Sequence, residues 1–262
     1  MKTATLLYNN YYNIGDLRVN SISASARWNR RNGRTSATSP GLYTYFFKHF
    51  IDVALSLALL VAASPLLLLA LALTMLDGHR NPLFLQRRIG LNGREFTIYK
   101  FKTMQSPSPN APPVDIKPDA PELTPIGRFM RKTGLDELPQ LINIIKGDMS
   151  LIGPRPYAVR HGQRYANIDS RYYERYRVRP GLACIVEVTK LHYLTDTPGH
   201  FKSRINCDLY YINHLSLALD IKIFIKMVRC VLKSLMLELF GTERHFVPAP
   251  MKMAPRQVLQ LK

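Results

Sequence analysis

Two adjacent carboxylates, Asp136 and Glu137, lie in the stretch of sequence whose residue types are best suited to catalysis, Leu135-Asp-Glu-Leu-Pro-Gln140. An apolar run follows, so we expect Asp136 to cap a helix that runs from Glu137 to about Lys146, with Pro139 tolerated in its first turn. A helix N-terminus offers free N–H groups and positive potential, which would hold a phosphate beside the two carboxylates. The structural alternative is an N-cap and a first-turn acid that only satisfy the helix dipole.

A single arginine on a restricted backbone is the second feature. Arg155 lies in Gly153-Pro-Arg-Pro156, where the flanking prolines limit the backbone and leave the guanidinium little entropy to lose on binding a phosphate. The alternative is a stiff turn with a solvent-exposed arginine. Arg128, Arg131 and Lys132, just before the carboxylates, add positive charge to the same region.

The whole chain is strongly basic. Its 262 residues hold 36 lysines and arginines against 18 aspartates and glutamates, which gives a formal net charge of +18. This surplus indicates an anionic partner, which could be nucleic acid, an anionic leaflet or a phosphorylated substrate. The three cysteines are far apart and form no Cys-x-x-Cys pair, which is typical of a reduced, cytosol-facing protein without a zinc site.

One long apolar segment has the composition of a membrane helix. Residues 53–75 read VALSLALLVAASPLLLLALALTM and carry no charge, which is long enough to cross a bilayer. Pro65 follows Ser64 near the middle and predicts a kink, because proline removes a backbone hydrogen bond. Basic residues flank both ends, so the positive-inside rule favours neither orientation. We therefore favour a re-entrant helix that returns to its own side over a kinked helix that crosses.

The chain divides into four parts by composition. Residues 1–44 are predicted to form a flexible basic tail and residues 241–262 a C-terminal tail. Residues 45–76 contain the re-entrant membrane helix kinked at Ser64-Pro65. Residues 77–240 are expected to form a cytosolic, membrane-associated catalytic domain.

Within this domain, apolar runs at residues 83–85 and 96–99 predict a small hairpin, and the proline-rich residues 105–125 predict a surface loop. A basic amphipathic helix is expected over residues 210–240. Its cations recur at helical spacing and suit either a membrane interface or the solvated face of a globular helix: Lys222, Lys226, Arg229 and Lys233. The expected fold is a helix-rich α/β body with amphipathic interfacial helices.

Together these motifs resemble the bacterial sugar transferase family, the monotopic phosphoglycosyl transferases. The resemblance extends over residues 46–235, and the block at 135–140 followed at fixed distance by Gly-Pro-Arg-Pro is its most specific part. The full ordered set is Lys48-His-Phe-Ile-Asp52, Gln86-Arg-Arg-Ile-Gly90, Tyr99-Lys-Phe-Lys-Thr-Met104, Leu135-Asp-Glu-Leu-Pro-Gln140, Lys146-Gly-Asp-Met-Ser150, Gly153-Pro-Arg-Pro156, Val178-Arg-Pro-Gly181 and Asp208-Leu-Tyr-Tyr-Ile-Asn213.

The resemblance implies transfer of a sugar 1-phosphate from a UDP-sugar to undecaprenyl phosphate, with release of UMP, as the first step of exopolysaccharide, O-antigen, capsule or glycoprotein glycan synthesis. Asp136 matches the family nucleophile, which forms an aspartyl phosphosugar intermediate, and Glu137 would help to bind Mg²⁺. Arg155 and Arg131 match arginines expected to steady phosphates. Lys100 and Arg179 also fall in family motifs, although a surface role suits each equally well.

The resemblance also implies a re-entrant helix, with the active site at the cytosolic face of the bacterial inner membrane. The expected partners are a UDP-sugar, a polyprenyl phosphate and membrane lipids but no nucleic acid, with a homodimer and downstream glycosyltransferases as further candidates. The chain departs from the family at Leu182-Ala-Cys-Ile-Val-Glu-Val188, where Ile-Thr-Gly and a Gln-Val pair are usual. Donor contacts there are expected to differ, and the sequence leaves open which sugar is used.

Two other functions fit parts of the sequence. The net charge, the basic residues 27–34 and 14 tyrosines suit a nucleic-acid-binding protein, but no helix-turn-helix or aromatic-strand motif supports one. A catalytically silent membrane scaffold for a glycan assembly system would use the tail and the proline-rich loop, and the intact Asp136–Glu137 pair argues against it.

Overall fold

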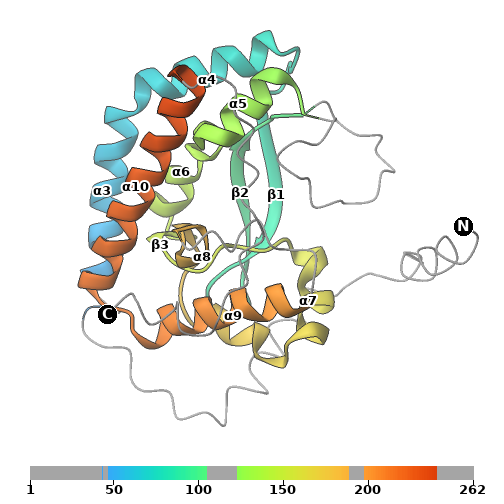
Figure 1. The fold of residues 1–262 in the computed structure, drawn as a ribbon, viewed down its shortest axis with the longest axis vertical. Helices are drawn as coiled ribbons and strands as arrows, with labels where there is room; N and C mark the ends of the chain where they lie inside the picture. The colour runs from blue at the N-terminus through green and yellow to red at the C-terminus, as the bar shows by residue number, and fades with distance from the viewer. Residues whose placement is uncertain (1–42, 44–46, 105–122, 189–197, 241–262) are drawn as a thin grey trace, which may run out of the picture. The chain divides into compact units, whose positions relative to one another are not determined.

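The computed structural model describes residues 43, 47–104, 123–188 and 198–240 (Figure 1). The predicted tails, apart from Tyr43, and most of the predicted proline-rich loop lie outside these residues. The described elements are mainly helices with two small sheets, so the expected helix-rich α/β fold is confirmed.

Two helices meet at a sharp bend beside Ser64 and Pro65. Helix α3 spans Lys48–Ala62, helix α4 spans Ser64–Leu76, and the two are bent by 65°. Pro65 lies in the first turn of α4, where its missing N–H would have no intrahelical partner anyway. In the described part of the chain, no single helix is long and apolar enough to cross a membrane, whereas this bent pair passes that test on length and composition.

A two-stranded antiparallel hairpin follows. Strand β1, Leu83–Ile89, pairs with strand β2, Glu95–Phe101, in a register that runs from Leu83 opposite Phe101 to Ile89 opposite Glu95. The one-turn helix η3, Leu91–Gly93, joins them with positive φ at Asn92 and Gly93. The predicted hairpin is therefore confirmed, with both strands longer than their apolar runs.

The rest of the body is built from short helices, the two longer helices α9 and α10, and a second small sheet, in which two strands pair in parallel. Fully buried apolar side chains from several elements, among them Ile98, Ile144, Met149 and Ile223, form its core. In chain order the elements are α5 (Pro125–Thr133), η4 (Leu135–Glu137), α6 (Gln140–Ile145), β3 (Ser150–Ile152), η5 (Val159–His161), α7 (Gly162–Ile168), η6 (Ser170–Arg177), β4 (Gly181–Ala183), α8 (Ile185–Val188), α9 (Pro198–Asn213) and α10 (Leu217–Phe240).

The single helix predicted over residues 210–240 is wrong, because the structure divides it into α9 and α10. The break follows Asn213, and Ser216 then accepts a hydrogen bond from the backbone N–H of Leu219 at 3.3 Å. A serine at this place satisfies an otherwise unpaired N–H and favours a new helix start over continuation.

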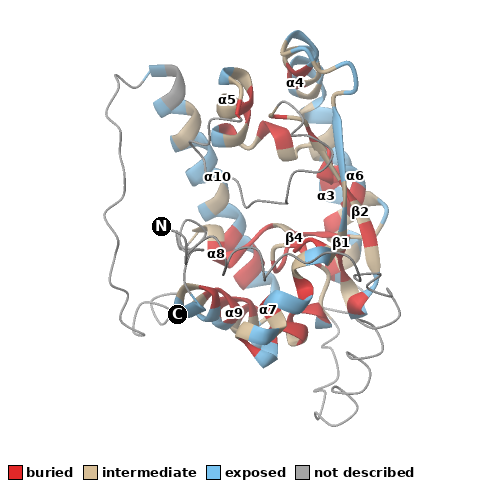
Figure 2. Cartoon of the chain, turned by 90° about the vertical axis from the view of Figure 1, so that its right-hand side faces the viewer, coloured by how far each residue is buried: buried red, intermediate tan, exposed pale blue. Residues whose placement is uncertain are grey.

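Helix α10 has three distinct faces. Leu219 and Ile223 are buried in the core, while the four predicted cations, Lys222, Lys226, Arg229 and Lys233, are all exposed. Figure 2 shows α10 mostly exposed or half-buried along its length. Its third face exposes large apolar side chains, which include Ile221, Phe224, Val228, Leu232 and Met236. An apolar stripe beside a cationic stripe is the pattern of a helix at a membrane interface.

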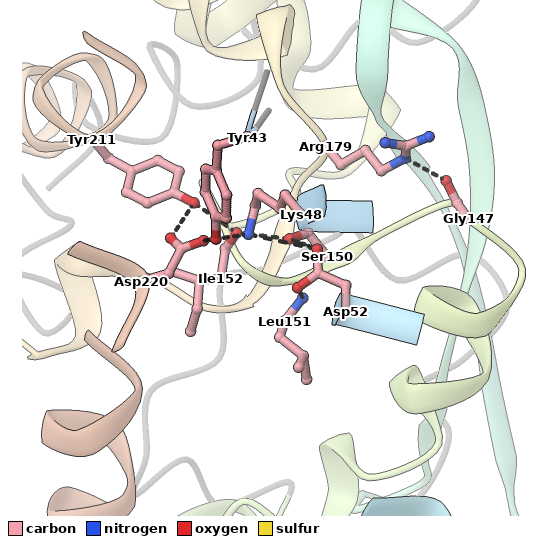
Figure 3. A network of polar contacts seen from close by, with 10 residues as sticks. All are labelled: Tyr43, Lys48, Asp52, Gly147, Ser150, Leu151, Ile152, Arg179, Tyr211 and Asp220. Atoms are coloured by element: carbon pink, nitrogen blue, oxygen red, sulfur yellow. Dashed lines mark hydrogen bonds and ion pairs between the residues drawn. The ribbon is translucent and has the colours of Figure 1, made fainter. Parts of the chain in front are cut away.

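Buried polar side chains join α3 to the body (Figure 3). The ammonium of Lys48 lies 2.7 Å from Asp220 and 3.5 Å from Asp52. The hydroxyl of Tyr211 donates to Asp220 at 2.7 Å, and that of Ser150 donates to Asp52 at 2.5 Å. Because each buried carboxylate has a cation and a hydroxyl beside it, the network fixes α3 against α10, α9 and β3.

Candidate active site

The segment that carries the two carboxylates is a tight turn between helices. Helix α5 ends at Thr133 and is followed by Gly134, whose φ of +75° suits glycine. The turn η4 then holds Asp136 and Glu137. Helix α6 begins only at Gln140, after Pro139. The prediction that Asp136 caps a helix starting at Glu137 is therefore wrong. An N-cap aspartate accepts from the backbone N–H two or three residues on, and Pro139, at the third place, has no N–H to donate, which weakens such a cap. The backbone N–H groups of Glu137 and Leu138 instead donate to the carbonyls three residues before them, in a 3₁₀ turn.

Both carboxylates are enclosed, but they have different neighbours. Asp136 is 6% exposed. Glu137 accepts hydrogen bonds on Oε1 from Lys100 of β2 at 2.5 Å and from Arg155 at 2.9 Å. The structure thus brings together four of the residues that the sequence singled out.

This difference separates the acidities of the pair. Burial raises the pKa of Asp136 to about 6, with Glu137 adding to the rise and Lys100 opposing it. Burial would also raise the pKa of Glu137, but Arg155 and Lys100 outweigh it and lower that pKa. Glu137 is therefore a fixed anion. Asp136 makes no side-chain hydrogen bond with the described residues and is mostly ionised at neutral pH, as a nucleophile requires.

Arg155 lies between two carboxylates from separate segments. One terminal nitrogen donates to Glu137 and the other donates to Glu187 of α8. These acids raise the pKa of Arg155 well above its ordinary value, Glu137 contributing most. Sequence reasoning missed Glu187; the only signal was the departure from the family pattern around it.

A buried ion pair holds the backbone of Arg155. Arg175 donates to the Arg155 carbonyl at 2.7 Å and to Asp208 of α9 at 2.7 and 3.1 Å. The side chains of Arg175 and Asp208 are each 1% exposed, and the guanidinium lies 4.2 Å from the centre of the Tyr157 ring. No local pattern in the sequence indicates Arg175, although Asp208 lies in a motif used for the resemblance.

The two remaining predicted cations lie in different places. Arg131 donates to the hydroxyl of Thr103 at 2.9 Å. Burial lowers the pKa of Arg131, while Asp136 and Glu137 oppose that shift, so Arg131 lies within electrostatic range of the pair. Arg179 instead donates to the Gly147 carbonyl at 3.0 Å (Figure 3). Gly147 follows α6, whereas Asp136 and Glu137 precede it, so the contact of Arg179 lies at the other end of this helix.

The described residues contain no group of three or more His, Cys, Asp or Glu side chains that could enclose a metal ion. Mg²⁺ does not need such a group, because it commonly binds through one or two carboxylates, water and substrate phosphates. Asp136 and Glu137 fit that donor set. With Lys100, Arg131 and Arg155 around them, they form a site suited to a diphosphate and a nucleophilic carboxylate.

A family model described as bacterial sugar transferase matches residues 43–234. The chain belongs to this family. A UDP-glucose:undecaprenyl-phosphate glucose-1-phosphate transferase of Caulobacter vibrioides is 37% identical over 185 residues, which cover 71% of this chain and 69% of the relative. The exopolysaccharide production protein PSS of Rhizobium leguminosarum bv. phaseoli is 35% identical over 181 residues, which cover 67% of this chain and 90% of the relative.

One longer relative is named for a different sugar. A UDP-N-acetylgalactosamine-undecaprenyl-phosphate N-acetylgalactosaminephosphotransferase of Aeromonas hydrophila is 34% identical over 187 residues, which cover 71% of this chain but 44% of the relative. These matches confirm the prediction of a phosphoglycosyl transferase enzyme. Because the relatives are named for different sugars, family membership does not fix the sugar.

Proposed function

We propose that the protein transfers a sugar 1-phosphate from a UDP-sugar to undecaprenyl phosphate, releases UMP and so initiates a bacterial polysaccharide. The observation that carries this proposal is the buried carboxylate of Asp136 beside Glu137, with Lys100, Arg131 and Arg155 around the pair. Acceptor and donor classes follow the names of the relatives.

In the first step, a carboxylate oxygen of Asp136 bonds to the phosphorus that carries the sugar. The bond from that phosphorus to the oxygen shared with UMP breaks, and UMP leaves with the electron pair. An oxygen of undecaprenyl phosphate then attacks the same phosphorus, and the bond to Asp136 breaks to regenerate the carboxylate. Each step exchanges one phosphorus–oxygen bond for another.

The cations have separate tasks in this proposal. Arg155 presents a planar guanidinium to the diphosphate, and its backbone is held by Arg175. Lys100 and Arg131 add positive charge where charge accumulates on the departing UMP. Glu137 orients Lys100 and Arg155 through its hydrogen bonds to both.

Glu137 is the residue that would hold Mg²⁺. Lys100 and Arg155 both contact Oε1 of Glu137, and the carboxylate would contribute an oxygen ligand to the ion beside water and substrate phosphate. Bound there, Mg²⁺ would neutralise part of the diphosphate charge.

We further propose that α3 and α4 form a re-entrant hairpin in the cytosolic leaflet of the inner membrane. Both helices and α10 expose large apolar side chains, among them Phe50, Val61, Leu68, Leu76 and Leu232. The 65° bend takes the pair off a straight path across a bilayer, which supports re-entry without excluding a broken span. A bilayer would cover this apolar surface.

Cysteine labelling tests the membrane topology. In a Cys230→Ser background, Phe47→Cys and Arg80→Cys place a thiol at an exposed position beside each end of the bent pair. A membrane-impermeant maleimide added to intact spheroplasts is expected to label neither, and to label both after permeabilisation. Labelling of one position alone in intact spheroplasts would show a crossing helix instead.

The main test of function is UMP release by purified protein in nanodiscs with undecaprenyl phosphate, Mg²⁺ and a panel of UDP-sugars. We expect release with one or a few donors and loss of release when a chelator removes Mg²⁺, because the diphosphate charge is then less neutralised. Restored Mg²⁺ should restore turnover. Folded protein that releases no UMP from any donor contradicts the proposal and favours the scaffold alternative.

A further inference from the structure

Arg155, the cation assigned above to the donor diphosphate, is already engaged by a carboxylate outside the Asp136–Glu137 pair. Its two terminal nitrogens donate to Glu137 and to Glu187. The Arg155 side chain is 33% exposed, compared with 15% for Glu187. An incoming phosphate would therefore reach the guanidinium from solvent while Glu187 holds it from the protein side.

The position of Glu187 is fixed by contacts at both of its oxygens. Oε1 accepts from Arg155, and Oε2 accepts from the backbone N–H of Cys184 at 3.2 Å. Cys184 directly precedes α8, which packs against α9 and α10. Both carboxylate oxygens of Glu187 therefore have partners, and the side chain is held in one position beside Arg155.

The charges show what Glu187 does there. Lys100, Arg131 and Arg155 supply three positive charges, and the two carboxylates of η4 supply two negative charges when both are ionised. Glu187 adds a third negative charge in direct contact with Arg155. Without Glu187 the site would keep a net positive charge for an anionic ligand, and with it that surplus is cancelled.

We propose that Glu187 sets the affinity of the site for the donor, because it competes with the donor's phosphates for Arg155 and thereby weakens binding of the nucleotide. This inference rests on the proposed function, since it takes Arg155 as a phosphate-binding residue. A carboxylate in contact with Arg155 would repel a diphosphate bound to the same guanidinium, both in the bound substrate and in the transition state. Its effect falls mainly on KM and leaves kcat nearly unchanged, as expected for uniform binding.

The test replaces Glu187 by glutamine, which keeps the shape and removes the charge. Glu187→Gln is expected to lower KM for the UDP-sugar about tenfold with kcat within about twofold, because one like charge is removed beside the diphosphate. The dissociation constant for UDP, measured by titration calorimetry in nanodiscs, should fall by the same factor. Glu187→Asp keeps the charge and should stay near the parental KM.

Glu95→Gln is the matched control, because Glu95 forms a similar ion pair with Arg87 at 2.9 Å on the hairpin. It should change neither constant. If Glu187→Gln binds UDP as weakly as the parental protein or more weakly, the inference is wrong. The proposed function still stands in that case, provided that the parental protein releases UMP. If the parental protein binds UDP but releases no UMP, the proposed function is wrong. Tighter UDP binding by Glu187→Gln would still support competition at Arg155 in that case.

Discussion

Replacing Asp136 by asparagine is expected to lower UMP release on the order of 10⁴-fold, a loss typical of removing a catalytic nucleophile. The amide oxygen is a poor nucleophile and cannot form the phosphosugar intermediate. Because Asp136 is 6% exposed and burial raises its pKa, a neutral amide of the same size should not lower the free energy of unfolding. Initial rates of UMP release and thermal unfolding of both proteins measure the two effects.

A second assay separates the nucleophile from its neighbour. With UDP-sugar labelled in the phosphate that carries the sugar and no acceptor lipid, the parental protein should become labelled, and Asp136→Asn should not. Glu137→Gln should also lose activity but with reduced stability, because Lys100 and Arg155 lose their shared anionic partner. Labelling of the Asp136→Asn protein would place the nucleophile on another residue.

Replacing Arg175 by methionine is expected to lower the free energy of unfolding by about 3–5 kcal/mol, the usual result of breaking a buried ion pair. The change leaves the carboxylate of Asp208 without its cation in a place where both side chains are 1% exposed. Thermal unfolding in detergent at matched protein concentration measures the loss. An unfolding temperature equal to that of the parental protein would contradict the burial and pairing described for Arg175.

The double variant Arg175→Met with Asp208→Leu separates stability from positioning. An apolar pair of similar volume should recover most of the stability, because no unpaired charge remains. Activity should stay reduced, because the carbonyl of Arg155 still lacks the hydrogen bond from Arg175. Full recovery of both properties would show that Arg175 acts on folding alone.

Features encoded by neighbouring residues could be predicted from the sequence. The alternation at residues 96–99 predicted the hairpin, and Ser64-Pro65 predicted the bend, because period and proline act within one or two turns. The helix start at Glu137 was predicted wrongly for a local reason as well. The weight given to an aspartate N-cap was too large, because Pro139 lacks the backbone N–H that such a cap would bind at the third helical position.

The site residues that the sequence did not reveal depend on pairs distant in the chain. Glu187 lies 32 positions from Arg155, and Asp208 lies 33 positions from Arg175. A spacing this long carries no periodic signal, and arginine and aspartate are most often surface residues. Only the packing of η6 against α9 shows that Arg175 and Asp208 are buried partners. Whether Arg179 has a role in the site stays a prediction, since its contact lies at the other end of α6.

The buried contact between Lys48 and Asp220 has a consequence for biosynthesis. The two residues are 172 positions apart, so a ribosome exposes α3 long before it makes the carboxylate that completes the network. Until then Lys48 has only the longer contact with Asp52, at 3.5 Å. Final packing of α3 against the body therefore waits for the carboxyl-terminal helix, which makes completion of this polar network one of the last events in the synthesis of the chain.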